Sequence, residues 1–175
     1  MSAAYSFRAP IDADTPALAA LGRDSFTAAF AHLYAPEDLA AFLDETHDEA
    51  AVARRIASSG RVYRLATSAG GTLAGYCQLV LRDSFEPASA ALRPITLSQL
   101  YCAGWATGSG VGSALMDWAL AEARTRGADE MRLSVWAGNH GAQRFYARYG
   151  FEHIADIGFW VGQQRDDEFL YALKL

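Results

Sequence analysis

The chain has 175 residues, of which 51% are hydrophobic and 20% are charged, and its formal net charge is −5. This length suits one domain spanning residues 1–175, and the balance of apolar and charged residues argues against disorder. An acidic chain lacks the surplus of lysine and arginine that neutralises phosphates, so we expect no nucleic-acid partner.

The sequence shows no sign of membrane insertion or secretion. Its longest uncharged stretch, residues 94–116, contains Pro94 and four glycines, which do not suit a membrane span. The N-terminus has no basic segment followed by an apolar core, so we expect a cytoplasmic protein. Two cysteines, Cys77 and Cys102, and four scattered histidines predict neither a disulfide nor a metal site.

The first third of the chain is predicted to form a strand and three helices. Residues 5–9 alternate as a strand does, and Asp14 or Thr15 is expected to cap a helix with Pro16 at its first position. Apolar residues then recur at near-helical intervals, at Leu18, Leu21, Phe26 and Phe30. Two further helix starts are predicted at Pro36 and Asp48.

The net charge lies entirely in this first third. Residues 1–60 hold nine acidic residues and four arginines, whereas residues 61–175 hold eleven of each sign. Such an acidic region favours a cationic ligand. The alternative is that these side chains only solvate amphipathic helices.

From residue 61 the pattern becomes that of alternating strands and helices. Residues 61–67 and 72–81 are predicted to form a hairpin, followed by a loop over residues 83–93. The remaining predicted elements are strand 95–103, helix 111–126, strand 131–136, helix 141–149, and strands 151–161 and 168–175, the last two joined by a polar loop over 162–167.

A glycine-rich turn separates strand 95–103 from helix 111–126, and it reads Thr107-Gly108-Ser109-Gly110-Val111-Gly112-Ser113. Glycines permit positive φ and close approach to the backbone, and the first turn of a helix carries unpaired N–H groups and a partial positive charge. The turn lacks the Lys-Ser/Thr of a P-loop and the G-x-G-x-x-G of a dinucleotide fold. We predict a phosphate site of another kind, with ordinary helix-start glycines as the alternative.

A second motif, Asn139-x-x-Ala142-x-x-Phe145-Tyr146-x-x-x-Gly150-Phe151, follows about thirty residues later. With Leu100-Tyr101-Cys102 and the glycine turn, it resembles motifs A and B of the GCN5-related N-acetyltransferase (GNAT) superfamily. The resemblance spans nearly the whole chain, and its specific motifs lie in residues 95–151. It implies an α/β fold with one mixed, mostly antiparallel sheet, a splayed parallel strand pair, and helices on both faces.

The resemblance also implies a binding site for acetyl-CoA, with the pyrophosphate at the glycine turn and the pantetheine along strand 95–103. The chain departs from the family pattern at Thr107, where Gln or Arg is usual, which predicts weakened but not abolished coenzyme binding. The coenzyme-binding residues that it implies are Leu100, Tyr101, Cys102, Thr107, Gly108, Ser109, Gly110, Val111, Gly112, Ser113, Asn139 and Tyr146.

Tyr146 occupies the position of the family's general acid, and a phenol remains protonated at neutral pH, ready to donate. The alternative is an aromatic core residue beside Phe145. The base stays open, because the strand before the turn has no carboxylate: either water relays the proton, or an acid such as Glu37 or Glu45 reaches in. Cys102 is disfavoured as a covalent acetyl carrier, because no His–acid pair is tied to it.

The resemblance therefore implies an acetyl-CoA-dependent N-acetyltransferase that needs no metal and acts directly on a primary amine. Residues 30–39 and 159–162 are similar to the PaiA-type polyamine acetyltransferase group, which implies a small cationic acceptor such as a polyamine. Alternatives are a protein N-terminus, an amino acid or a drug as acceptor, or an acyl-CoA sensor without catalysis. Residues 1–60 would form the acceptor-side cap, and exposed C-terminal strands are compatible with a homodimer.

Overall fold

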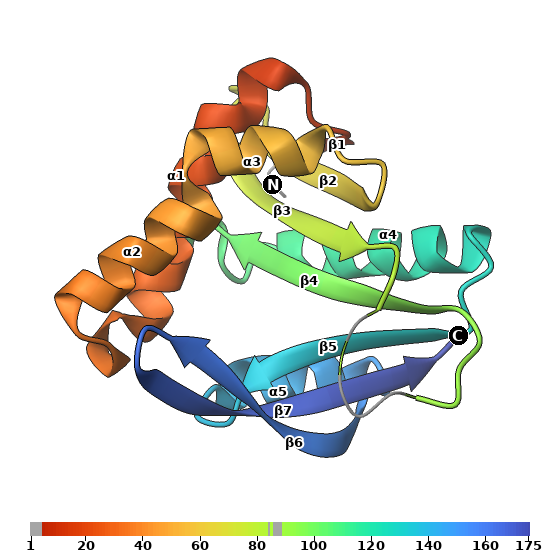
Figure 1. The fold of residues 1–175 in the computed structure, drawn as a ribbon. Coiled ribbons are helices and arrows are strands. Elements are labelled where there is room, and N and C mark those ends of the chain that lie inside the picture. The colour runs from red at the N-terminus through yellow and green to blue at the C-terminus, as the bar shows by residue number, and fades with distance from the viewer. Residues whose placement is uncertain (1–4, 84, 86–88) are drawn as a thin grey trace.

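Seven strands form one mixed sheet in the order β1-β2-β3-β4-β5-β7-β6 (Figure 1). The computed structural model describes residues 5–83, 85 and 89–175. The strands β4 and β5 are parallel, and every other neighbouring pair is antiparallel, which confirms the predicted sheet. The strand bounds are β1 Tyr5–Arg8, β2 Arg61–Ser68, β3 Leu73–Val80, β4 Pro94–Cys102, β5 Glu130–Trp136, β6 Glu152–Val161 and β7 Gln164–Lys174.

Helices cover both faces of the sheet, as predicted. Successive strand residues point to opposite faces, and Leu65 and Tyr76 pack with α1 and α3 while Ala66 and Cys77 pack with α4. The second helix, α2, lies beside α1 and contacts β6 at one end of the sheet (Figure 1). The helix bounds are α1 Thr15–Phe30, α2 Pro36–His47, α3 Glu49–Ile56, α4 Val111–Thr125 and α5 His140–Arg148.

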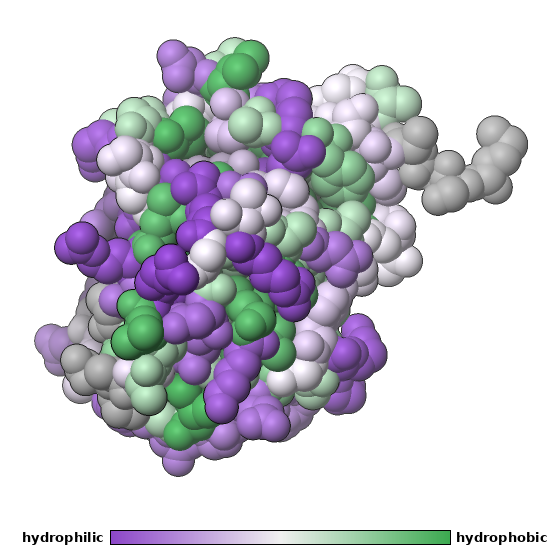
Figure 2. Space-filling model, turned by 90° about the vertical axis from the view of Figure 1, so that its right-hand side faces the viewer, coloured by the Kyte–Doolittle hydropathy of each residue, from purple (hydrophilic) through white to green (hydrophobic). Residues whose placement is uncertain are grey.

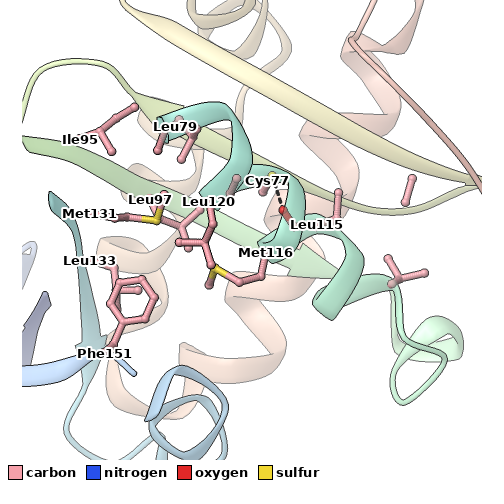
Figure 3. Packing of buried hydrophobic residues seen from close by; sticks show 14 of the residues in the cluster. Cys77, Leu79, Ile95, Leu97, Leu115, Met116, Leu120, Met131, Leu133 and Phe151 are labelled. Atoms are coloured by element: carbon pink, nitrogen blue, oxygen red, sulfur yellow. Dashed lines mark hydrogen bonds between the residues drawn. The ribbon is translucent and has the colours of Figure 1, made fainter. Parts of the chain in front are cut away.

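The largest buried cluster lies between α4 and the centre of the sheet (Figure 3). Leu115, Met116 and Leu120 of α4 pack against strand residues such as Leu79 and Met131. Burial of this apolar surface anchors α4 to β3, β4 and β5. The glycine turn at the start of α4 is therefore attached to a rigid support.

Cys77 belongs to this core and has no exposed thiol. Its Sγ lies 3.7 Å from the Leu115 carbonyl oxygen, to which it donates. Burial raises the pKa of the Cys77 thiol to about 12, so the group stays protonated at neutral pH.

Two predicted helix caps have different outcomes. The Asp48 carboxylate accepts hydrogen bonds from the N–H groups of Ala50 and Ala51, which confirms the predicted start of α3. The carboxylate of Asp14 makes no capping hydrogen bond to α1, and Thr15 is the first residue of that helix. Asp14 instead binds the guanidinium of Arg8 at 2.6 Å and 2.8 Å, in a bidentate pair in which both groups are charged.

The predicted polar loop over residues 162–167 is wrong. The last strand, β7, begins at Gln164, and Val161 pairs with Gln164 across a tight turn. Gly162 has a φ of 57°, which a two-residue hairpin turn requires and glycine adopts without strain. The polar run forms a strand because its side chains alternate: Asp167 is exposed, whereas Asp166 is buried and accepts a hydrogen bond from the Tyr34 hydroxyl.

The surface at the end of the sheet nearest the C-terminus has no extended apolar patch. Figure 2 shows that hydrophobic residues on this face are interspersed with hydrophilic ones. Within residues 5–83, 85 and 89–175, no helix combines the length and the apolar character needed to cross a bilayer. The same residues contain no group of three or more histidine, cysteine or acidic side chains placed to hold a metal ion.

Candidate active site

The site lies where the two parallel strands separate. Strands β4 and β5 pair only from Pro94 to Thr96, and the paired residues of β4 from Leu97 onward have partners on β3 alone. On the β3 side, Ser98 has no partner between Leu97 and Gln99, which marks a bulge in β4. A bulge bends a strand and increases its twist, so β4 turns away from β5 just after their last pair (Figure 1).

A cavity of about 450 Å³ occupies this opening. The first two helices close it on one side, and β4, β5 and α5 form the other walls. The lining residues are Ser25, Phe26, Ala29, Phe30, Phe42, Thr46, His47, Leu97, Ser98, Gln99, Leu100, Tyr101, Ser134, Val135, Trp136, Asn139, Ala142, Tyr146, Phe159 and Glu168. We call this space the main cavity; its volume suits a small organic molecule.

The glycine turn presents open backbone at the start of α4. Gly108 and Gly110 have φ values of 78° and 89°, and a Cβ added at either residue would meet nothing within 4 Å. No side chain caps α4, and its first turn carries no acidic residue. The N–H groups of Val111, Gly112 and Ser113 therefore stand at a helix N-terminus suited to an anion.

The hydroxyl groups of the turn bind within the turn itself. The Ser109 hydroxyl donates to the Ala106 carbonyl oxygen at 2.6 Å, and the Thr107 hydroxyl donates to the Ala103 carbonyl oxygen at 3.4 Å. Thr107 thus braces the loop. At this position, where the family usually has Gln or Arg, the chain has a short side chain whose hydrogen bond stabilises the turn.

Tyr146 reaches the main cavity from α5. Asn139 caps this helix through its Oδ1, which accepts a hydrogen bond from the Ala142 N–H at 3.1 Å, as predicted. The ring of Tyr146 packs against Phe145 and Phe151. Burial, with smaller contributions from Tyr101 and Cys102, raises the pKa of the Tyr146 hydroxyl well above its usual range. The phenol is therefore protonated at neutral pH.

The predicted site residues fall into two groups. Leu100, Tyr101, Asn139 and Tyr146 line the main cavity. Residues 107–113 lie outside its lining, at the start of α4, and Cys102 connects the two groups because its Sγ lies 3.5 Å from where a Cβ of Gly112 would be. Burial raises the pKa of the Cys102 thiol, which argues further against a covalent carrier.

The acidic side chains suggested as bases from the cap do not reach the cavity. Glu37 and Glu45 are exposed, and neither lines the main cavity. Both lie on α2, whose inward side is apolar and carries Phe42 and Leu43. The helical period, which places about three or four residues per two turns on the core side, leaves these two carboxylates on the solvent side.

Glu168 is a cavity residue that sequence reasoning missed. It lies on β7 opposite Trp136 of β5, and its carboxylate accepts a hydrogen bond from the Ser134 hydroxyl. Burial, with a further contribution from the negative charge of Asp166, raises the pKa of Glu168 above its usual range. The sequence shows only a charged residue at the predicted start of the last strand; the pairing with β5 brings it to the site.

A set of aromatic residues, which sequence reasoning did not single out, lines the main cavity together with Glu168, and we call it the aromatic wall. Its members are Phe26, Phe30, Phe42, Trp136 and Phe159. Ring centroids lie 4.6 Å apart for Phe26 and Phe42 and 5.7 Å apart for Phe42 and Phe159, as in packed aromatic clusters. Behind this wall Tyr34 binds Asp166 through its hydroxyl.

His47 completes the lining from the end of α2. Its side chain is buried among Phe26 and Tyr101. Burial, together with the nearby positive charges of Arg55 and Arg23, lowers the pKa of His47 to about 4. The imidazole is therefore neutral at physiological pH.

Comparison with known proteins agrees with this geometry. The sequence model of the Acetyltransferase (GNAT) family matches residues 24–151. An uncharacterized N-acetyltransferase of Mycobacterium tuberculosis is 31% identical over 162 residues, which cover 93% of this chain and 98% of that protein. An uncharacterized N-acetyltransferase of Lactobacillus delbrueckii subsp. lactis is 27% identical over 162 residues, covering 93% of this chain and 92% of the relative.

Solved structures share the fold. The PaiA N-acetyltransferase of Thermoplasma acidophilum, in complex with coenzyme A, superimposes with a TM-score of 0.79 at 21% identity, covering 98% of this chain and 99% of that one. The ribosomal-protein-alanine N-acetyltransferase of Brucella melitensis has a TM-score of 0.69 at 22% identity, with coverage of 97% and 99%.

Proposed function

Because the chain belongs to the GNAT family and is an acetyl-CoA-dependent N-acetyltransferase, we propose that its acceptor is a primary amine of a small cationic molecule such as a polyamine. The observation that carries this proposal is the lining of the main cavity, which the aromatic wall shares with Glu168 and Tyr146. Aromatic faces and a carboxylate attract a cation.

The coenzyme would lie along the path from the glycine turn to the main cavity. The open space at Gly108 and Gly110, which a Cβ would fill, suits close approach of a diphosphate to backbone N–H groups from Thr107 to Ser113. The free side of β4 at Leu100, Tyr101 and Cys102 offers strand hydrogen bonds to the pantetheine amides. Asn139 would add a contact while it caps α5.

Tyr146 would serve as the general acid. Its hydroxyl is protonated at neutral pH and lines the same cavity as Leu100 and Tyr101. The coenzyme supplies a thioester, and the phenol would donate its proton to the departing thiolate. A phenol still holds its proton at neutral pH, so it can give that proton to the thiolate that forms as the C–S bond breaks.

The two stretches similar to the PaiA-type group support a polyamine acceptor, because they are neighbours in the fold. Phe30 and Tyr34 from the first stretch pack with Phe159 and Val161 from the second. Gly162 lies so close to the Asp38 carboxylate that a Cβ there would overlap it. Of these residues, Phe30 and Phe159 line the main cavity, where the two stretches would contribute to its acceptor side.

The charged residues in and around the main cavity also favour a cationic acceptor. Among the residues that the structure describes, neither lysine nor arginine lines the main cavity. Some acidic residues of the first third have structural roles, because Asp14 binds Arg8, Asp44 binds Arg23 and Asp48 caps α3. The remaining acidic groups add to a negative field that would attract a polycation.

A thiol-release assay across acceptor classes tests the proposal. The purified protein is incubated with acetyl-CoA and either polyamines, amino acids, aminoglycosides or N-terminal peptides. We expect the highest kcat/KM with a linear polyamine and product acetylated on a primary amine, as identified by mass spectrometry. A higher kcat/KM with a peptide or an amino acid would show that the acceptor belongs to that class and is not a polyamine. Coenzyme binding without turnover on any amine would favour a sensor.

The homodimer remains a prediction. The edge strand β6 exposes Ile154 and Trp160, whose relative accessibilities are 45% and 61%. Edge strands with exposed apolar side chains can pair with a second copy. Size-exclusion chromatography with light scattering would show a mass twice that of the chain if this edge forms the dimer.

A further inference from the structure

Glu168 lies where three cavities meet. It lines the main cavity, a second cavity of about 610 Å³ bounded by Phe85 and Asp156, and a small one of about 10 Å³ beside Tyr34 and Asp166. Of the acidic residues in the described part of the chain, Glu168 is the one in the lining of the main cavity. Its carboxylate can therefore meet an acceptor that enters from this side.

The surrounding strands hold this carboxylate in place. Glu168 pairs with Trp136 across the β5–β7 ladder, and the hydroxyl of Ser134, which lies on the same side of β5, donates to it. A carboxylate has about four lone-pair sites. The Ser134 bond thus leaves Glu168 with capacity to accept a hydrogen bond from an amine in the cavity.

The ionisable groups around Glu168 come from several elements. Asp166 lies on the same strand, Tyr34 precedes α2, and Tyr101 lies on β4. Burial and then the negative charge of Asp166 raise the pKa of Glu168, and burial, with a smaller contribution from the charge of Glu168, raises the pKa values of Tyr34 and Tyr101. His47 and Tyr146 line the same cavity. Burial and the charge of Asp166 make Glu168 a stronger base than an exposed carboxylate.

We propose that Glu168 is the general base of the reaction, which rests on the proposed function. The ammonium form of the acceptor gives one proton to the Glu168 carboxylate, and the neutral nitrogen then forms a bond to the thioester carbonyl carbon. The C–S bond breaks, and the thiolate takes the proton of the Tyr146 hydroxyl. The second proton of the nitrogen restores the phenol, and Glu168 releases its proton to water.

The Glu168→Gln variant tests this role, with Asp167→Asn as the matched control. Asp167 is the next residue, and its exposed side chain binds Arg165 at the surface. With the best amine found in the thiol-release assay, we expect Glu168→Gln to lower kcat by roughly 100-fold or more. Coenzyme affinity and thermal midpoint should match the wild type, and Asp167→Asn should keep full activity.

The pH profile separates a base from a residue that only attracts the acceptor. For the wild type, kcat/KM should rise with pH around a midpoint above 4.5, the usual pKa of Glu, and below the pKa of the free amine. This rise should disappear in Glu168→Gln, whose activity should follow deprotonation of the amine alone. Glu168→Asp should retain the rise at a reduced rate.

An acceptor with a weakly basic amine provides a second readout. A fluorinated analogue whose nitrogen is neutral at the assay pH does not need the first proton transfer. The loss of activity in Glu168→Gln should therefore be several-fold smaller with this analogue than with the parent amine. A merely structural defect would lower both rates equally, and that result would contradict the proposal.

Two outcomes overturn the proposal in distinguishable ways. If Glu168→Gln raises only the KM of the acceptor and keeps both kcat and the pH-dependent rise, Glu168 is a binding residue and the proposed function stands. If the wild type binds coenzyme but acetylates no amine, both the proposed function and the role of Glu168 are refuted.

Discussion

Trp136 of β5 and Glu168 of β7 are directly paired across the antiparallel ladder, and both side chains line the main cavity. The pair places an aromatic face and a carboxylate side by side at the point where β4 has turned away from β5. An amine nitrogen bound there can contact both groups. The acceptor site that we propose thus depends on β7, which lies outside the family's two sequence motifs.

Replacing Tyr146 by Phe should reduce turnover and spare coenzyme binding. The variant lacks the hydroxyl that would protonate the thiolate, so kcat should fall by roughly 10²–10⁴-fold. Calorimetric titration with coenzyme A should give the wild-type dissociation constant, because the ring remains in place. Tyr5→Phe, on the far edge strand, is the control, and an undiminished kcat in Tyr146→Phe would rule out the phenol as the acid.

Replacing Gly110 by Ala should weaken coenzyme binding. Gly110 has a φ of 89°, a region that costs an L-residue about 1–2 kcal/mol, so the turn should relax to another shape. We expect a dissociation constant raised about tenfold, which corresponds to about 1.4 kcal/mol. Gly71→Ala is the matched control: its φ of 82° and open surroundings are similar, but it lies in the β2–β3 hairpin. Equal affinities in both variants would contradict the assigned phosphate site.

The buried His47 should make stability depend on pH. Its pKa is about 4 in the folded protein, compared with 6.5 for a histidine in the unfolded chain. As the pH falls, the unfolded chain therefore binds a proton at this residue before the folded protein does. The contribution of the neutral imidazole is complete above pH 6.5 and is lost as the pH falls towards 4. The free energy of unfolding should drop by up to about 3 kcal/mol over this range, compared with His47→Gln. Urea titrations at several pH values measure it, and identical pH dependence in both proteins would refute the assignment.

Replacing Gly22 by Ala should destabilise the protein although the residue lies within a helix. Alanine normally favours a helix by about 1 kcal/mol over glycine. At Gly22, however, a Cβ would overlap the His47 ring and lie 2.9 Å from the Tyr76 hydroxyl oxygen. Overpacking of this kind costs about 1–3 kcal/mol. Gly141→Ala in α5 is the control, because its nearest neighbour is 3.8 Å away and it should not lower the thermal midpoint.

Local patterns were sufficient for most elements, and they also indicated the glycine turn and Tyr146 as candidate site residues. Apolar periodicity located the helices, and the order of strands and the glycine turn agreed with the GNAT family. The cap of α5 by Asn139 could also be predicted from the sequence, because capping involves residues three apart along the chain. Such features depend on neighbours along the chain.

The proposed acceptor side could not be predicted in this way, because its parts come from segments that are far apart in sequence. The polar run from Gln164 to Glu168 looked like a loop, yet it forms a strand whose alternate side chains meet Tyr34 and the main cavity. Likewise, Glu37 and Glu45 were plausible bases until the orientation of α2 turned them to solvent. Periodicity in the sequence identified the buried stripe of each helix and the type of each strand. Which carboxylate faces the cavity was determined only by the pairing of β7 with β5 and the packing of α2 on β6. The physical reason is that strand register and helix docking arise from contacts between residues far apart in the sequence.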